Sequence, residues 1–222
     1  MPLHSSSSTT SHSIFVPASG SLLAGNLAIP QNATGLVLFA HGSGSSRNSP
    51  RNKFVARQLN EMHLGTLLID LLTEQEEVLD EETGVLRFDI PLLTDRLVEI
   101  IDWLVINPDT EGLILGIFGA STGAASAIGA AVRREKWINA VVSRGGRPDL
   151  AESYLQELAA PTLLIVGGHD STVLSLNQKA FNTMNCVKNL SIIEGATHLF
   201  SEAGALEQVS LESGQWFNRY LK

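Results

Sequence analysis

The feature that most constrains the fold is an alternation of short apolar runs with longer amphipathic segments along a chain of 222 residues. The apolar runs are rich in Val, Ile and Leu and alternate little with polar residues, which is typical of strands buried on both faces of a parallel sheet. Strands that alternate with helices form right-handed crossovers, which place helices on both faces of the sheet. The pattern therefore predicts a single α/β domain over residues 14–222.

The individual elements follow from the same pattern. Residues 14–16 and 22–29 are expected to form a hairpin with Gly20 in its turn, followed by strands at 35–40, 66–71, 113–118, 140–143, 162–166 and 190–193. Helices are expected at 51–62, 91–105, 121–134, 149–158, 174–184 and 205–221. The Ser- and Thr-rich residues 1–13 are expected to be a flexible tail. The acidic stretch 74–82 is expected to be a solvated excursion between a strand and a helix, with a lid as the alternative.

Charge and cysteine content exclude several classes of function. The chain has 23 acidic and 15 basic residues and a formal charge of −8, so its surface is expected to repel nucleic acid and anionic membranes. The single cysteine, Cys186, excludes an internal disulfide and a multi-thiolate metal site, and it is expected to be a packing residue. No apolar run approaches the roughly 20 residues that span a bilayer, and the N-terminus lacks the features of a signal peptide. We therefore expect a cytoplasmic protein without nucleic-acid or membrane partners.

The candidate nucleophile lies directly after the strand expected at 113–118. The segment Gly119-Ala120-Ser121-Thr122-Gly123 fits the pattern G-x-S-x-G, in which a sharp strand-to-helix turn exposes a serine hydroxyl. Such a turn requires small neighbours, which the glycines supply, and it directs the serine to a helix N-terminus that stabilises negative charge. The alternatives are a glycine-rich nucleotide loop or simple close packing. A nucleotide loop normally follows the first strand of its domain, whereas this segment follows a later one.

Two further residues complete a candidate triad. Asp170 follows the strand expected at 162–166, and His198 follows the strand expected at 190–193. Both loops are expected at the carboxyl edge of the sheet, where open α/β sheets bind ligands. Because a serine hydroxyl is a weak nucleophile, His198 would take its proton as a base, and Asp170 would fix the tautomer of the imidazole. Asp70 and Asp149 are the fallback acids.

The loop after the strand expected at 35–40 is the candidate oxyanion loop. It begins with His41-Gly42-Ser43-Gly44. Its backbone can direct an N–H group at the oxygen of a tetrahedral intermediate, and the amide that directly follows the nucleophile supplies a second donor. The expected donors are the amides of Ser43 and Thr122, with Gly42 as the alternative to Ser43.

These motifs resemble those of the α/β-hydrolase superfamily and, within it, the dienelactone hydrolase-like group. The resemblance covers nearly the whole chain and depends mainly on His41-Gly42, the segment around Ser121, Gly168-His169-Asp170 and Thr197-His198. It implies an eight-stranded, mostly parallel sheet without a large cap domain, and hydrolysis of an ester, thioester or lactone without a cofactor or metal. Dienelactone hydrolases proper use a cysteine nucleophile, so the serine at position 121 puts dienelactone itself in doubt as the substrate.

The same triad is compatible with other functions. An acyltransferase or a small peptidase can use it, and a binding or regulatory module can be built on the same scaffold. A nucleotide-binding oxidoreductase is a further alternative. For the leading hypothesis, the partner is a small-molecule acyl substrate. Four arginines are expected near the active site: Arg47, Arg51, Arg144 and Arg147. We expect the substrate to carry an anionic group that Arg144 binds, with Arg47, because a guanidinium suits a carboxylate or phosphate. The alternative is that these arginines pair with Asp149 and the stretch 74–82.

Overall fold

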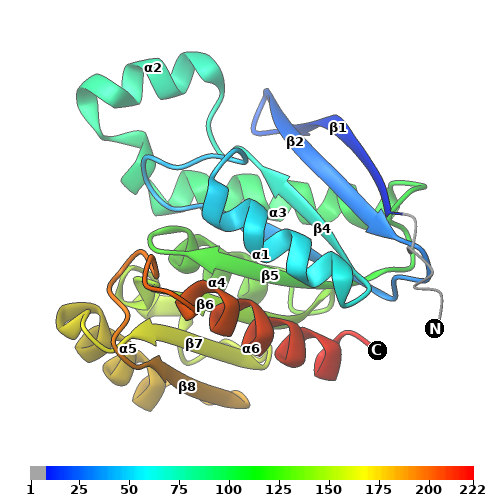
Figure 1. Cartoon of the computed structure of the whole chain (residues 1–222). Coiled ribbons are helices and arrows are strands. Elements are labelled where there is room, and N and C mark those ends of the chain that lie inside the picture. Colours follow the sequence, from blue (N-terminus) through cyan, green and yellow to red (C-terminus); the bar gives the residue numbers. More distant parts are fainter. Residues whose placement is uncertain (1–8) are drawn as a thin grey trace, which may run out of the picture.

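The structure is a computed structural model that describes residues 9–222 (Figure 1). Its strands are β1 (Thr9–Ala18), β2 (Ser21–Pro30), β3 (Gly35–Ala40), β4 (Leu64–Ile69), β5 (Ile114–Ala120), β6 (Ile138–Arg144), β7 (Thr162–Gly167) and β8 (Lys188–Ile193). They form one eight-stranded sheet in the order β1-β2-β4-β3-β5-β6-β7-β8. The β1–β2 and β2–β4 pairs are antiparallel and the others are parallel. The prediction of a mostly parallel sheet is confirmed.

Helices cover both faces of this sheet. They are α1 (Pro50–Glu61), α2 (Glu74–Thr83), α3 (Ile90–Ile106), α4 (Gly123–Arg133), α5 (Ser171–Thr183) and α6 (Ala205–Tyr220), with short 3₁₀ helices at Leu86–Phe88 and Pro148–Tyr154. The buried side chains form one cluster with α1 and α6 and another with α3, α4 and α5, so these two groups of helices lie on opposite faces (Figure 1). No described helix is both long and apolar enough to cross a membrane.

The order of the strands places the candidate site at the centre of the sheet. From β3 the chain passes through α1 to β4, on one side, and from β5 it passes through α4 to β6, on the other. The carboxyl ends of β3 and β5 are therefore a topological switch point, where ligands bind in open α/β sheets. Ser121 directly follows β5, and His41 directly follows β3.

Two segments differ from the sequence prediction. Residues 9–13, expected in a flexible tail, belong to β1 and pair with residues 26–30 of β2, so this part of the prediction is wrong; residues 1–8 lie outside the described part of the chain. The side chains of residues 9–13 are exposed, so this segment has no apolar alternation that would predict a strand. Backbone pairing with β2 holds it in the sheet. The helix expected at 149–158 is instead a 3₁₀ helix at Pro148–Tyr154.

The acidic stretch forms the helix α2, which projects beyond the carboxyl edge of the sheet (Figure 1). A capping box starts this helix, because the Thr73 hydroxyl accepts from the Glu76 amide and the Glu76 carboxylate accepts from the Thr73 amide. Glu76 also pairs with Arg96 of α3, whose side chain is only 2% exposed, at 2.6 Å. The excursion is therefore attached to the domain by a specific ion pair.

Candidate active site

Ser121 occupies the strained turn that the sequence predicts. Its φ is +51°, in the left-handed region that non-glycine residues rarely adopt. Its amide donates to the carbonyl of Arg144 at 3.1 Å, and its carbonyl accepts from the amides of Ala124 and Arg147. These bonds fix the turn between β5 and α4 against the end of β6, so that the Ser121 side chain lies at the carboxyl edge of the sheet.

The glycines around Ser121 are required by close backbone approach. A Cβ atom on Gly119 would lie 2.5 Å from Cα of Ala124, and one on Gly123 would overlap the carbonyl oxygens of Ala40 and His41. Any side chain at either position would force the turn apart. The glycines of the motif are thus explained by packing of the turn, which is also what holds Ser121 in place.

His198 and Asp170 form a hydrogen-bonded pair beside this turn. Nδ1 of His198 lies 2.6 Å from Oδ2 of Asp170, with side chains 41% and 15% exposed respectively. The loops that carry them are in contact, because the amide of His169 donates to the carbonyl of Ala196 at 2.9 Å. Asp170 precedes α5 without capping it through its side chain, so its carboxylate is available to orient the imidazole.

The pair is connected to Ser121 through the end of β6. A Cβ atom on Gly145 would lie 3.5 Å from Cε1 of His198, and Arg144, its neighbour, accepts the hydrogen bond from the Ser121 amide. In residues 9–222 the Ser121 hydroxyl makes no hydrogen bond, including none to His198. The bond between nucleophile and base often tightens only when a substrate binds. The structure therefore gathers the three predicted residues at one edge and joins two of them directly.

The expected oxyanion donors belong to two segments that lie next to Ser121. A Cβ atom on Gly42 would lie 2.9 Å from Cβ of Ser121, so the loop after β3 approaches the serine closely. The Ser43 amide donates to the Thr122 hydroxyl at 2.9 Å. The amide of Thr122 is at the N-cap of α4 and has no hydrogen-bond partner within the described chain. The Thr122 amide is thus free to bind an oxyanion, whereas an oxyanion at the Ser43 amide would have to replace the Thr122 hydroxyl.

His41 has a structural role that the sequence did not reveal. Its Nε2 accepts from the Leu71 amide at 2.9 Å, so the proton is on Nδ1, which donates to the Gly42 carbonyl at 3.0 Å. Burial lowers the pKa of this imidazole, which favours the neutral form that can accept the bond from Leu71. His41 therefore ties the oxyanion loop to the residues that follow β4. The partner at Leu71 is a tertiary contact without a sequence signal.

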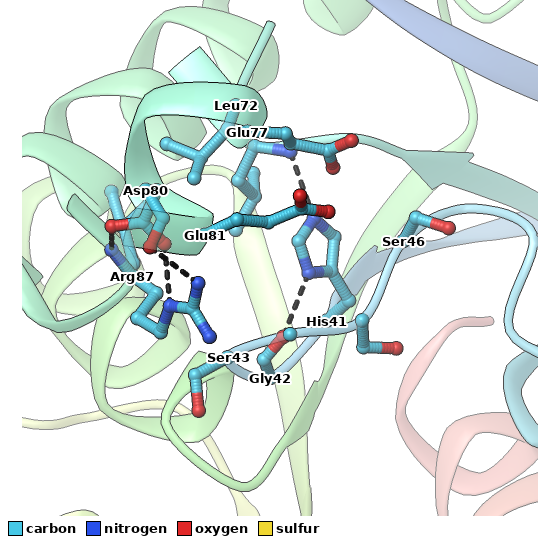
Figure 2. A pocket seen from close by; sticks show the side chains of 13 residues that line it. His41, Gly42, Ser43, Ser46, Leu72, Glu77, Asp80, Glu81 and Arg87 are labelled. Carbon is cyan, nitrogen blue, oxygen red and sulfur yellow. Dashed lines mark hydrogen bonds and ion pairs between the residues drawn. The ribbon is translucent and has the colours of Figure 1, made fainter. Parts of the chain in front are cut away.

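A pocket of about 200 Å³ adjoins this loop (Figure 2). Its walls are the oxyanion loop, three leucines and the inner side of α2, with these lining residues: His41, Gly42, Ser43, Gly44, Ser45, Ser46, Leu71, Leu72, Leu93, Glu77, Asp80, Glu81 and Arg87. Glu81 extends from α2 toward His41 (Figure 2). Burial raises the pKa of Glu77, and the charges of Asp70 and Glu81 add to this effect. Glu77 and Glu81 are four residues apart, a spacing that places both on one face of a helix and could have indicated this wall from the sequence.

The arginines near the site have different environments. Arg47 pairs with Asp70, and Arg147 pairs with Asp149 at 2.7 Å, so neither fallback acid contacts His198. For Arg147, the pairing is the alternative that the sequence allowed. Arg144 makes no ion pair or side-chain hydrogen bond within residues 9–222. Of the two predicted substrate-binding arginines, Arg47 has a carboxylate partner and Arg144 has none within residues 9–222.

Comparison with known proteins identifies the family. No protein-family model matches the chain. A dienelactone hydrolase from Anabaena variabilis is 53% identical with a TM-score of 0.95, over 96% of this chain and 99% of that protein. Est1E from Butyrivibrio proteoclasticus shares the fold, at 15% identity and a TM-score of 0.78, over 93% of this chain and 98% of Est1E.

Two curated Mycobacterium tuberculosis proteins, from strains CDC 1551 and H37Rv, are each 50% identical over 199 residues and carry the provisional name of a phosphoribosyl transferase. The match covers 90% of this chain but only 44% of each relative, so the chain spans less than half of their length. The structural match, by contrast, extends over nearly the full length of both proteins. The chain therefore belongs to the dienelactone hydrolase-like group of the α/β hydrolases.

Proposed function

We propose that the protein hydrolyses a carboxylic ester, thioester or lactone of a small molecule, with Ser121 as nucleophile, His198 as general base and Asp170 as its orienting acid. The observation that carries this proposal is the 2.6 Å bond between His198 and Asp170, at the same edge of the sheet as a serine held at positive φ. A strained serine beside an oriented imidazole is the arrangement that acyl transfer requires.

The reaction follows from these positions. The Ser121 oxygen attacks the carbonyl carbon while Nε2 of His198 takes the hydroxyl proton, and Asp170 stabilises the imidazolium through Nδ1. Collapse of the tetrahedral intermediate transfers that proton to the leaving oxygen or sulfur and leaves an acyl ester on Ser121. Water then attacks the acyl group by the same route, which releases the acid and restores the serine. The chemistry assigned to these residues involves no cofactor or metal.

The amides of Thr122 and Ser43 are the proposed oxyanion donors. The Thr122 amide needs no rearrangement, because it has no partner in the described chain. The Ser43 amide would exchange the Thr122 hydroxyl, now at 2.9 Å, for the developing oxyanion. A negatively charged oxygen accepts a hydrogen bond more strongly than a hydroxyl does, so this exchange favours the transition state over the ground state.

The pocket beside α2 is the proposed site for one end of the substrate. It shares Gly42 and Ser43 with the oxyanion loop, while none of the triad residues lines it. A group bound there would therefore contact the oxyanion loop and not the triad residues. A volume of about 200 Å³ suits a small acyl or leaving group better than a long lipid chain.

A non-catalytic binding role is the second candidate, favoured by the absence of a bond between Ser121 and His198 in residues 9–222. Transfer of the acyl group to an acceptor other than water, as in an acyltransferase, also fits the triad. The transferase name of the Mycobacterium tuberculosis relatives belongs to proteins of which this chain covers 44%.

Trapping of the acyl-enzyme separates catalysis by the triad from a binding role. Brief incubation with 4-nitrophenyl acetate, acid quenching and intact-mass spectrometry should show the mass of one acetyl group on the wild-type protein. Peptide mapping should locate it on Ser121, and the Ser121→Ala variant should carry none. A wild-type protein that turns over no ester and never becomes acylated supports the binding role instead.

A further inference from the structure

Arg144 is a buried cation directly beside the triad. It is the last residue of β6, and its backbone carbonyl accepts the hydrogen bond from the Ser121 amide. The residue is only 8% exposed, and its Nε is enclosed without a hydrogen-bond partner. Its Cζ lies 5.7 Å from the ring centroid of Phe200, two residues after His198. The guanidinium thus packs against the same loop that carries the proposed base.

A second unpartnered guanidinium belongs to the segment that follows the oxyanion loop. Arg51 is in the first turn of α1, directly after the oxyanion loop, and its Nε is also enclosed without a partner. Burial, and secondly the charge of Arg51, lower the pKa of Arg144 to about 10. The first turn of this twelve-residue helix has no acidic side chain, so its dipole adds to the positive potential.

The other arginines near carboxylates show what this pair lacks. Six arginines form ion pairs with aspartate or glutamate in the described chain: Arg47, Arg87, Arg96, Arg133, Arg134 and Arg147. Arg144 and Arg51 have no such partner there, although the chain has a formal charge of −8. A buried charge is costly unless it is paired, and a second positive charge that acts on it raises that cost. An external anion that contacts both guanidinium groups would remove both costs.

The outer nitrogens of the two guanidinium groups are not fully enclosed. Only Nε of each arginine is fully enclosed, so the Nη atoms, which make no hydrogen bond in residues 9–222, retain some exposure. An Arg side chain presents these nitrogens as a planar fork that fits two oxygens of a carboxylate or phosphate. Phe200 covers one face of Arg144 and keeps that fork in a fixed orientation.

We propose that Arg144 and Arg51 form a subsite for a doubly negative oxyanion group, such as a phosphate monoester or phosphonate, on the acyl substrate that Ser121 attacks. The double charge is inferred because two guanidinium groups lack a partner, and a single carboxylate would neutralise only one. This subsite rests on the proposed function for its role in catalysis. Its capacity to bind an anion does not, because neither arginine takes part in the proposed chemistry.

Binding of inorganic phosphate tests the subsite without turnover. Isothermal titration of the Ser121→Ala variant should detect phosphate binding at one site, and the additional substitution Arg144→Met should weaken it about tenfold or more, as expected for a lost charge-assisted hydrogen bond. Arg51→Met should weaken it similarly. The control, Arg57→Met, removes an exposed guanidinium from the same helix and should leave binding unchanged. Equal phosphate binding in all variants, or none in Ser121→Ala, would overturn the subsite.

Substrate selectivity tests the same subsite during turnover. We expect kcat/KM for 4-nitrophenyl esters to rise from butyrate to succinate to 3-phosphonopropionate, and the ratio of phosphonate to butyrate ester to fall about tenfold or more in Arg144→Met. Cleavage of all three esters with no preference that depends on Arg144 contradicts the subsite and leaves the hydrolase intact. Arg144-dependent phosphate binding without ester cleavage contradicts the hydrolase and leaves the subsite intact.

The melting temperature distinguishes the subsite from a structural role. Replacing an unpaired buried charge by Met should leave the melting temperature of Arg144→Met unchanged or raise it. A fall of several degrees would show that Arg144 supports the fold, and the subsite would then depend on the Arg51→Met result alone. If that variant also binds phosphate as tightly as the Ser121→Ala protein, the proposal is wrong.

Discussion

Nδ1 of His198 lies 2.6 Å from Oδ2 of Asp170, and this contact fixes which imidazole nitrogen is free to accept a proton. With the Nδ1 proton bonded to the carboxylate, Nε2 is the basic atom. The loops after β7 and β8 bring the two residues together through backbone contacts, including a Gly167 position at which a Cβ atom would overlap the carbonyl oxygen of Ala196. The tautomer of the proposed base is therefore set by the fold.

Replacing Asp170 with Asn tests that role. The amide can donate to Nδ1 and would then stabilise the wrong tautomer, so we expect kcat for ester hydrolysis to fall on the order of 10³–10⁴-fold with little change in KM. Steady-state kinetics with a 4-nitrophenyl ester measure both constants. Asp149→Asn is the control, since Asp149 pairs with Arg147, and it should retain nearly full kcat. Retention of kcat in Asp170→Asn would remove Asp170 from the triad.

Loss of the hydrogen bond between the Ser43 amide and the Thr122 hydroxyl should lower the stability of the protein without lowering its rate of catalysis. Thr122→Val removes the acceptor of the Ser43 amide and leaves the oxyanion as its main partner. We expect kcat to be unchanged or raised, while the free energy of unfolding falls by about 1 kcal/mol. Thr122→Ser keeps the hydroxyl and should behave as wild type. A tenfold loss of kcat in Thr122→Val alone would mean that the hydroxyl positions the loop for catalysis.

His41 should make the stability of the protein depend on pH. Its ordinary pKa is 6.5 and burial lowers it in the folded state, so an unfolded chain takes up a proton below pH 6.5 that the folded chain resists. The stabilising contribution is thus present above pH 6.5 and lost as the pH falls below it. Urea denaturation at several pH values should give a smaller loss in His41→Gln than in wild type, by up to about 1.4 kcal/mol per pH unit. Parallel curves for the two proteins would exclude His41 as the source.

The ion pair between Arg96 and Glu76 should hold α2 over the pocket. Arg96→Met leaves Glu76 without its partner, and we expect faster hydrogen exchange over residues 74–83, with a local loss on the order of 2 kcal/mol because Glu76 is partly exposed. Arg133→Met breaks an exposed pair with Asp95 and serves as the control. Unchanged exchange in Arg96→Met would show that other contacts anchor the helix.

Acid should release the same helix. The hydrogen bond from Arg96 lowers the pKa of Glu76 below its ordinary value of 4.5. A carboxylate of this kind stabilises the fold above its unfolded pKa and loses that contribution as the pH falls through the lower folded pKa. Protection factors over residues 74–83, which compare exchange with the rate of an unstructured chain at the same pH, should therefore fall in wild type below pH 4.5, and this fall should be much smaller in Arg96→Met. A fall of equal size in both proteins would place the acid effect elsewhere.

The sequence was sufficient to predict the sheet and the edge at which the site lies. Ser121, Asp170 and His198 each follow a strand of the parallel part of the sheet, and parallel strands bring their carboxyl ends together regardless of the details of packing. The segment at 9–13 was missed because its exposed polar residues carry no apolar alternation, and its pairing with β2 is a backbone interaction.

Partners of polar side chains could not be predicted, because they depend on how loops distant in sequence meet. Arg47 and Arg144 are both candidate substrate-binding residues in the sequence, yet Arg47 pairs with Asp70 and Arg144 is buried against Phe200. The bond from Leu71 to His41 similarly joins the ends of β4 and β3. These contacts decide which candidate residues remain available to a substrate.

The most direct test of the central claim is labelling with a fluorophosphonate probe, which reacts with an activated serine. Wild-type protein and Ser121→Ala are treated in parallel, and the modified residue is mapped by mass spectrometry. We predict labelling of the wild type on Ser121 and none of the variant. Equal labelling of both proteins would place the nucleophile elsewhere, and labelling of neither would contradict an activated Ser121.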